Sequence, residues 1–171
     1  MNYKEIKGDL IKLALAGQFD VVAHGCNCQC NMGAGIAPQM ARAFGADKFL
    51  MELSDRGNIN KLGQIDYRRF YITEGTVFGN MAKPENTNLA VVNAYTQFNY
   101  GKNHADGTAK PLDYEALTLC LRKMNHTFKG KHIGLPQIGC GLAGGDWLVV
   151  RSIIQKELKD CNVTIVIYER N

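Results

Sequence analysis

The chain has 171 residues, of which 46% are hydrophobic and 21% are charged, a composition typical of one folded domain. Its formal net charge of +4 comes from scattered lysines and arginines, which argues against nucleic acid as a primary ligand and suits a small anionic one. Charged residues interrupt the apolar N-terminal stretch, so we expect no signal peptide and no membrane contact, and we predict a cytoplasmic protein.

Apolar periodicity predicts that strands and helices alternate along the chain. The predicted strands are residues 3–7, 19–24, 65–72, 75–81, 89–96, 132–136 and 163–168. The predicted helices are residues 10–16, 36–44, 47–56, 113–128 and 146–158. The strand over 89–96 has the apolar density of a central strand, whereas the strands over 65–72 and 75–81 are expected to be partly exposed.

Asp9, Asp113 and Asp146 each precede a predicted helix and are placed to cap it. Strands that alternate with helices predict a three-layer α/β/α fold, in which helices cover both faces of a mixed, largely parallel sheet. Neither a repeat nor a linker divides the sequence, so we expect a single domain over residues 1–171 that is a monomer.

The six cysteines include a close cluster, Cys26, Cys28 and Cys30. These three are too close together to pair well with one another, and with no secretory signal we expect free thiols. The cluster is also rich in potential zinc ligands, but structural zinc sites need a second, well-spaced pair of ligands, which the sequence lacks. We therefore expect neither a metal nor a cofactor.

Two glycine-rich segments each follow a predicted buried strand and lead into a predicted helix. The first is residues 31–37 and the second is residues 137–145. Main-chain N–H groups and the positive end of the helix dipole favour a phosphate at such a junction. Because ligands of open α/β sheets sit beyond the carboxyl ends of the strands, we expect the two loops to meet at one crevice and hold a diphosphate from both sides.

Other nucleotide-binding motifs do not fit the sequence. Gly139-x-Gly141-x-x-Gly144 matches the dinucleotide fingerprint, but it lies near the end of the chain instead of in a first β-α-β unit. A phosphate-binding loop of the type G-x-x-x-x-G-K-[ST] is absent from the sequence, which argues against a nucleoside triphosphatase.

Three stretches of the sequence resemble the macrodomain family in their order and spacing. They are Gly8-Asp9-Leu10, VVAHGCNCQCNMGAGIA over residues 21–37, and LPQIGCGLAGGDW over residues 135–147. Two branches of the family are most similar. The ADP-ribose-1''-phosphate phosphatases have a comparable first loop, and the terminal ADP-ribose glycohydrolases have a GCGL second loop. The resemblance implies the macrodomain fold over nearly the whole chain.

The resemblance also implies a site for ADP-ribose. Asp9 would accept a hydrogen bond from the adenine amino group, Asn27 would face the distal ribose, and the two loops would hold the ribose and the diphosphate. A role as a helix cap alone would also explain Asp9. Tyr168 could line the adenine pocket, but ordinary packing at a strand end would also explain it. The implied substrate-binding residues are Asp9, Leu10, Asn27, Met32, Gly33, Ala34, Gly35, Ile36, Ile138, Gly139, Cys140, Gly141, Leu142, Ala143, Gly144 and Tyr168.

His24 is the candidate catalytic residue, because it is expected where its strand reaches the crevice. An imidazole that titrates near neutral pH can act as acid, base or nucleophile on a terminal phosphate, as the phosphatase branch implies. The glycohydrolase branch has a histidine here without using it for catalysis, so a structural role for His24 stays open.

Two differences from the glycohydrolase sequences argue against glycohydrolysis through a lysine adduct. Ala143 stands where the glycohydrolases have an aspartate, and residues 94–97 lack their lysine. A phosphatase would benefit from a carboxylate that orients water. The sequence does not single one out, because Asp113 and Asp146 are expected to be caps, and Asp106 and His104 lie in a polar loop.

The predicted function is removal of the terminal phosphate of ADP-ribose-1''-phosphate, giving ADP-ribose and phosphate without a metal. One alternative is a non-catalytic reader of ADP-ribose. A second is an ADP-ribosyl hydrolase that removes ADP-ribose from proteins by substrate-assisted attack of water, with an ADP-ribosylated protein as its partner.

Overall fold

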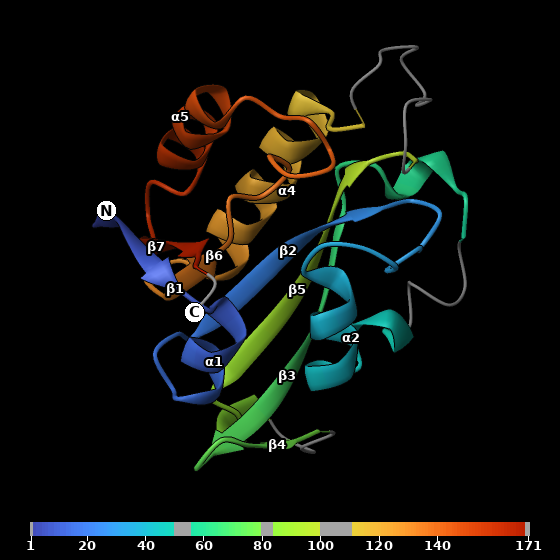
Figure 1. Cartoon of the computed structure of the whole chain (residues 1–171). Helices are drawn as coiled ribbons and strands as arrows, with labels where there is room; N and C mark the ends of the chain where they lie inside the picture. The colour runs from blue at the N-terminus through green and yellow to red at the C-terminus, as the bar shows by residue number, and fades with distance from the viewer. Residues whose placement is uncertain (1, 50–55, 80–83, 100–110, 170–171) are drawn as a thin grey trace.

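The computed structural model describes residues 2–49, 56–79, 84–99 and 111–169 (Figure 1). Within these residues, seven strands form one sheet in the order β1-β7-β6-β2-β5-β3-β4. The strands are β1 (Tyr3–Gly8), β2 (Val21–Asn27), β3 (Ile65–Thr73), β4 (Thr76–Phe78), β5 (Leu89–Gln97), β6 (His132–Leu135) and β7 (Asn162–Tyr168). Neighbouring strands from β1 to β5 are parallel, and β3 and β4 add an antiparallel edge. The predicted mixed, largely parallel sheet is confirmed.

Helices cover both faces of this sheet. Helices α1 (Leu10–Leu15) and α2 (Ala37–Phe44) lie on one face, and α4 (Tyr114–Thr127) and α5 (Trp147–Glu157) lie on the other (Figure 1). Three short 3₁₀ turns complete the described elements: η1 (Ala46–Lys48), η2 (Ile59–Lys61) and η3 (Pro84–Asn86). The three-layer arrangement therefore matches the prediction. None of the helices in the described ranges has the length and apolar character needed to cross a bilayer.

The three predicted N-caps are confirmed. Each aspartate oxygen accepts a main-chain N–H in the first turn of its helix: Asp9 from Lys12 at 3.0 Å, Asp113 from Ala116 at 3.0 Å and Asp146 from Leu148 at 2.9 Å. Because a capped first turn fixes where a helix begins, these contacts set how each preceding loop enters its helix.

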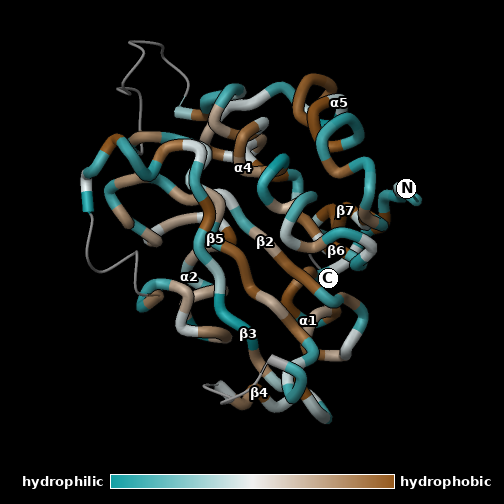
Figure 2. Tube along the Cα trace, turned by 180° about the vertical axis from the view of Figure 1, so that it is seen from behind, coloured by the Kyte–Doolittle hydropathy of each residue, from teal (hydrophilic) through white to brown (hydrophobic). Residues whose placement is uncertain are grey.

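The core follows the apolar pattern of the sequence. The central strands β2 and β5 are hydrophobic along much of their length, whereas β3, nearer the edge of the sheet, has hydrophilic stretches (Figure 2). The predicted inner face of α4 packs on β5, with Leu117, Cys120, Leu121, Met124 and Phe128 all buried. Val150 and Ile154 of α5 and Leu158 directly after it are also buried, while Trp147 is partly buried against the same cluster.

The helix predicted over residues 47–56 is wrong in the part that the structure describes. Gly45 adopts a left-handed conformation and ends α2, η1 makes a single turn, and Phe49 is extended. The Phe49 side chain is buried next to Phe70 and under the Arg68 guanidinium. Burial of a large ring in the core overrides the local helical pattern here. Residues 50–55 of this prediction lie outside the described residues.

The six cysteines, all within the described residues, form no disulfide, and Cys26 and Cys28 pack against Tyr95 in a small buried cluster beneath the first loop. Within the described parts of the chain, histidines, cysteines and carboxylates do not gather in groups of three or more that could hold a metal ion. The clustered cysteines therefore contribute packing beneath the loop.

Candidate functional site

A cavity of about 390 Å³ lies beyond the carboxyl ends of neighbouring strands of the sheet. Its volume is within the range of small-molecule sites, about 300 to 1,000 Å³. Both glycine-rich loops contribute to its wall, together with the end of β1 and the end of β7. The lining residues are Asp9, Leu10, Gly35, Ile36, Gln39, Pro136, Gln137, Cys140, Gly141, Val166 and Tyr168. The predicted meeting of the two loops at one crevice is confirmed.

The first loop connects β2 to α2 and is held by side chains. Asn27 Oδ1 accepts a hydrogen bond from the Asn31 N–H at 3.1 Å, and Asn27 Nδ2 donates to the Asn31 carbonyl at 2.9 Å. Asn31 Oδ1 in turn accepts from the Gly33 N–H at 3.0 Å. Gly35 has a φ of 66°, a conformation that glycine adopts without strain, and it brings the chain to the start of α2.

The second loop connects β6 to α5 and is held by its own main chain. The Cys140 N–H donates to the Gln137 carbonyl at 3.1 Å, and the Gly144 N–H donates to the Gly141 carbonyl at 3.0 Å. The Gly145 N–H closes the loop by donating to the Gly139 carbonyl at 2.8 Å. These turns form a compact loop whose shape is set by the backbone.

Several main-chain N–H groups of the two loops have no partner among the residues that the structure describes. In the first loop these include Gly35 and Ile36, and Ile36, the residue before α2, provides no side-chain cap. In the second loop they include the consecutive residues Gly141, Leu142 and Ala143. Donors left unpaired at a helix start or in successive turns are the groups that bind phosphate oxygens in proteins.

The side chains around the cavity differ between its two ends. Asp9 is the one carboxylate among the described lining residues, and its Oδ1 is already used as the cap of α1. Tyr168 is 63% exposed at the end of β7. At the loop end, burial and the nearby Asp146 raise the pKa of the half-buried Cys140 thiol to about 11. Cys140 is therefore a neutral thiol at physiological pH.

His24 does not reach the cavity, so its predicted position at the crevice is wrong. It lies in the middle of β2, is fully buried, and its Nε2 is 2.6 Å from Asn93 Oδ1. Because Asn93 Nδ2 donates to the Ala46 carbonyl at 3.0 Å, Asn93 Oδ1 is the acceptor and His24 Nε2 carries the proton. Burial lowers the pKa of His24 to about 4, so the imidazole is neutral.

Comparison with known proteins shows which fold the chain shares. No protein-family model matches it. A phage T4 protein, named as an uncharacterized 17.5 kDa protein in the tk-vs intergenic region, is 31% identical over 99% of this chain and 98% of its own length. The solved macrodomain of Thermus aquaticus DarG shares 20% identity and superimposes with a TM-score of 0.67, covering 98% of both chains. The chain has the macrodomain fold.

The names of two further similar proteins include ADP-ribose or a derivative of it. An ADP-ribose 1''-phosphate phosphatase of Meyerozyma guilliermondii is 25% identical over 97% of this chain and 98% of its own length. The structure of Thermosipho africanus DarTG in complex with ADP-ribose has a TM-score of 0.70 at 16% identity, and the match covers 98% of this macrodomain and 42% of that chain.

Only part of the predicted site of this macrodomain lines the cavity. Asp9, Leu10, Gly35, Ile36, Cys140, Gly141 and Tyr168 do so. The other predicted residues, Asn27, Met32, Gly33, Ala34, Ile138, Gly139, Leu142, Ala143 and Gly144, do not line it. The Ile138 and Ala143 side chains face the core, and Asn27 spends both of its polar atoms on Asn31. Asp106 and His104 lie outside the described residues.

Four lining residues of the macrodomain were not in the predicted site: Gln39, Pro136, Gln137 and Val166. Val166 could have been found from Tyr168, because residues two apart on a strand share a face. Gln39 follows Ile36 by three positions, which places both on the same side of the first turn of α2. Pro136 directly precedes the second loop, and Gln137 is its first residue.

Proposed function

We propose that this macrodomain binds ADP-ribose, with the diphosphate between the two glycine-rich loops. One observation carries the proposal: unpaired N–H groups of both loops belong to the wall of a single cavity. In this arrangement the N–H groups of Gly35 and Ile36 meet one phosphate, and that of Gly141 meets the other. No metal is needed to offset the charge, because aligned amides and the start of α2 supply positive potential.

The adenine would lie at the opposite end of the cavity. There the Asp9 carboxylate accepts a hydrogen bond from the adenine amino group, while Leu10, Val166 and the Tyr168 ring supply apolar contacts. Asp9 has two oxygens, so it can keep the Lys12 N–H on Oδ1 and still receive the adenine. Both interpretations of Asp9, cap and ligand contact, hold together in this arrangement.

Isothermal titration calorimetry with ADP-ribose tests binding directly. We expect saturable heat with one ligand per chain, and weaker binding of AMP, which lacks the second phosphate. Asp9→Ser separates the two roles of Asp9, because serine caps a helix about as well as aspartate but offers no carboxylate to adenine. We expect this variant to keep its melting temperature and to lose ADP-ribose affinity. Absence of saturable heat from the folded protein would refute the proposal.

We further propose that the macrodomain removes the terminal phosphate of ADP-ribose-1''-phosphate. The name of the Meyerozyma guilliermondii relative supports this activity. Buried His24 is a positioning residue in this proposal, since it holds β2 to β5 and η1 through Asn93 and Ala46. Turnover would then rest on orientation of the phosphate and water by the loop amides.

Phosphate release from ADP-ribose-1''-phosphate, compared with a buffer blank, decides between a phosphatase and a non-catalytic reader. Binding without release would leave the reader. Incubation with an ADP-ribosylated protein tests the third alternative, since a hydrolase would remove the label. Release of phosphate while the protein label persists is the result that the phosphatase proposal predicts.

A further inference from the structure

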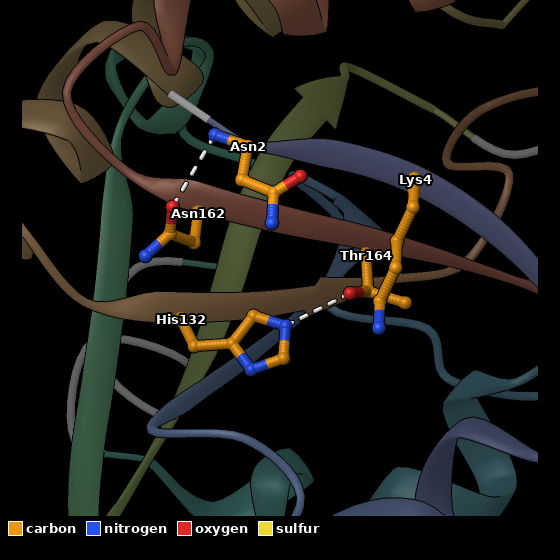
Figure 3. Close-up of a pocket in the computed structure, with 5 residues that line it drawn as sticks. All are labelled: Asn2, Lys4, His132, Asn162 and Thr164. Carbon is orange, nitrogen blue, oxygen red and sulfur yellow. Dashed lines mark hydrogen bonds between the residues drawn. The ribbon is translucent and has the colours of Figure 1, made fainter.

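A second, smaller pocket lies at the other end of the same sheet face. It has a volume of about 200 Å³ and is lined by Asn2, Lys4, His132, Asn162 and Thr164 (Figure 3). These residues come from the amino-terminal ends of the parallel strands β1, β6 and β7, or directly precede β1. Along β7, Asn162 and Thr164 line this pocket, while Val166 and Tyr168 line the candidate ADP-ribose cavity. The two pockets are therefore separate.

The lining of the small pocket is entirely polar and offers mainly donors. Lys4 supplies an ammonium group, and its side chain extends from β1 toward Thr164 (Figure 3). Asn162 Oδ1 accepts the Asn2 main-chain N–H at 3.2 Å, which leaves the Asn162 amide nitrogen as a donor. Neither Lys4 Nζ nor this nitrogen has a partner within the described part of the chain.

The back of the pocket is fixed in place. Thr164 is 1% exposed, and its hydroxyl is 2.8 Å from His132 Nε2. The His132 ring also packs edge-on against Phe19, with ring centroids 5.0 Å apart. The main-chain N–H of His132 donates to Asp20 Oδ2 at 2.9 Å. A side-chain pair that is held this way needs little reordering when a ligand arrives, which favours binding.

We propose that this pocket binds a small tetrahedral oxyanion, such as inorganic phosphate or sulfate. Lys4 disfavours a cation, and none of the five lining residues is a carboxylate. The Asp20 carboxylate accepts the main-chain N–H of His132 and does not line the pocket. The volume is below the roughly 300 Å³ at which sites for larger ligands begin, so a nucleotide does not fit. The inference is independent of the proposed ADP-ribose site.

The test is an NMR titration of the wild-type protein with sodium phosphate, against sodium chloride at matched ionic strength. We expect saturable shifts of the His132 ring, the Thr164 N–H and the Asn162 side-chain amide with phosphate and none with chloride. A parallel titration with glycerol phosphate identifies the source of the oxyanion: tighter binding of the ester assigns the pocket to phosphate monoesters, and tighter binding of the inorganic ion assigns it to the free ion.

Lys4→Met has a matched control on the same strand. Lys7 is also exposed but lies on the other face of β1, so Lys7→Met removes the same charge away from the pocket. We expect Lys4→Met to weaken phosphate binding at least fivefold and Lys7→Met to change it less than twofold. Asn162→Asp keeps the acceptor for Asn2 and adds a negative charge, so it should abolish binding without a change in melting temperature.

Two results would overturn the proposal. One is that phosphate shifts these signals linearly, without saturation, or no more than chloride does. The other is that Lys4→Met and Lys7→Met weaken binding equally, because the effect then reflects net charge instead of the pocket.

Discussion

The two loops that enclose the main cavity are built in different ways. The first loop depends on side chains, because Asn27 and Asn31 bond its backbone and the buried pair His24 and Asn93 anchors the strand before it. The second loop depends on its backbone, with turns closed by main-chain hydrogen bonds. The first loop should therefore respond to side-chain changes and to pH. The second loop should respond to Cβ atoms added at its glycines.

The glycines of the second loop also differ from one another. A Cβ at Gly145 would meet the Leu112 side chain and lie 2.7 Å from the Gly139 carbonyl oxygen. A Cβ at Gly141 would meet nothing within 4 Å. Glycine is thus required at position 145 by packing alone, whereas position 141 opens onto the cavity. A glycine-rich sequence can therefore combine structural and ligand-facing positions in one loop.

The largest expected effect is that of Gly145→Ala. We expect it to lower the free energy of unfolding by about 3 kcal/mol, because overpacking against backbone cannot relax cheaply. Gly141→Ala is the matched control and should change stability by less than about 0.5 kcal/mol. Urea unfolding of both variants provides the measurement. Equal losses in the two variants would show that packing does not distinguish these positions.

Acid should destabilise the first loop and the strand before it through protonation of His24. The folded state keeps the pKa of His24 at about 4, below its ordinary value of 6.5, so the unfolded chain binds a proton that the folded chain does not. Stability from this group is complete above pH 6.5 and is lost as the pH falls toward 4, with a loss of about 2 kcal/mol between pH 7 and pH 5. In urea unfolding, His24→Gln should remove this part of the dependence of the unfolding free energy on pH. An unchanged slope in the variant would assign the acid sensitivity to other groups.

Gly141→Glu tests the ligand-facing side of the second loop. We expect its ADP-ribose affinity to fall more than tenfold, or more than about 1.4 kcal/mol, because the side chain fills the cavity and repels phosphate. Gln155→Glu adds the same charge on the exposed surface of α5 and serves as the control. Calorimetry on the two variants measures the difference. Similar affinities would place the diphosphate elsewhere.

Asn31→Ala should have the smallest effect. It removes the acceptor for the Gly33 N–H in an exposed part of the first loop, which costs about 1 kcal/mol or less. Because the Gly35 and Ile36 donors then lie on a looser loop, we expect ADP-ribose affinity to fall a few-fold and the melting temperature to fall by no more than about a few degrees. Calorimetry and thermal unfolding check both parts, and an unaltered affinity would mean that the loop needs no such support.

Much of the fold could be predicted because the signals are local. Asp113 shows its capping role by its place before an apolar helical pattern, and the meeting of the two loops follows from a general rule of parallel sheets. The burial of His24 could not be predicted, since its partner Asn93 lies 69 residues away on β5. The extended conformation of Phe49 could not be predicted for the same kind of reason, because its ring packs near Phe70, which is distant in the sequence.

The central claim is that amides of both loops hold one diphosphate. An NMR titration of ¹⁵N-labelled protein with ADP-ribose tests it most directly. The account predicts that the N–H signals of Gly35 and Ile36 and that of Gly141 shift together in one saturable event. Shifts confined to one loop, or to neither while the ligand still binds, would contradict it.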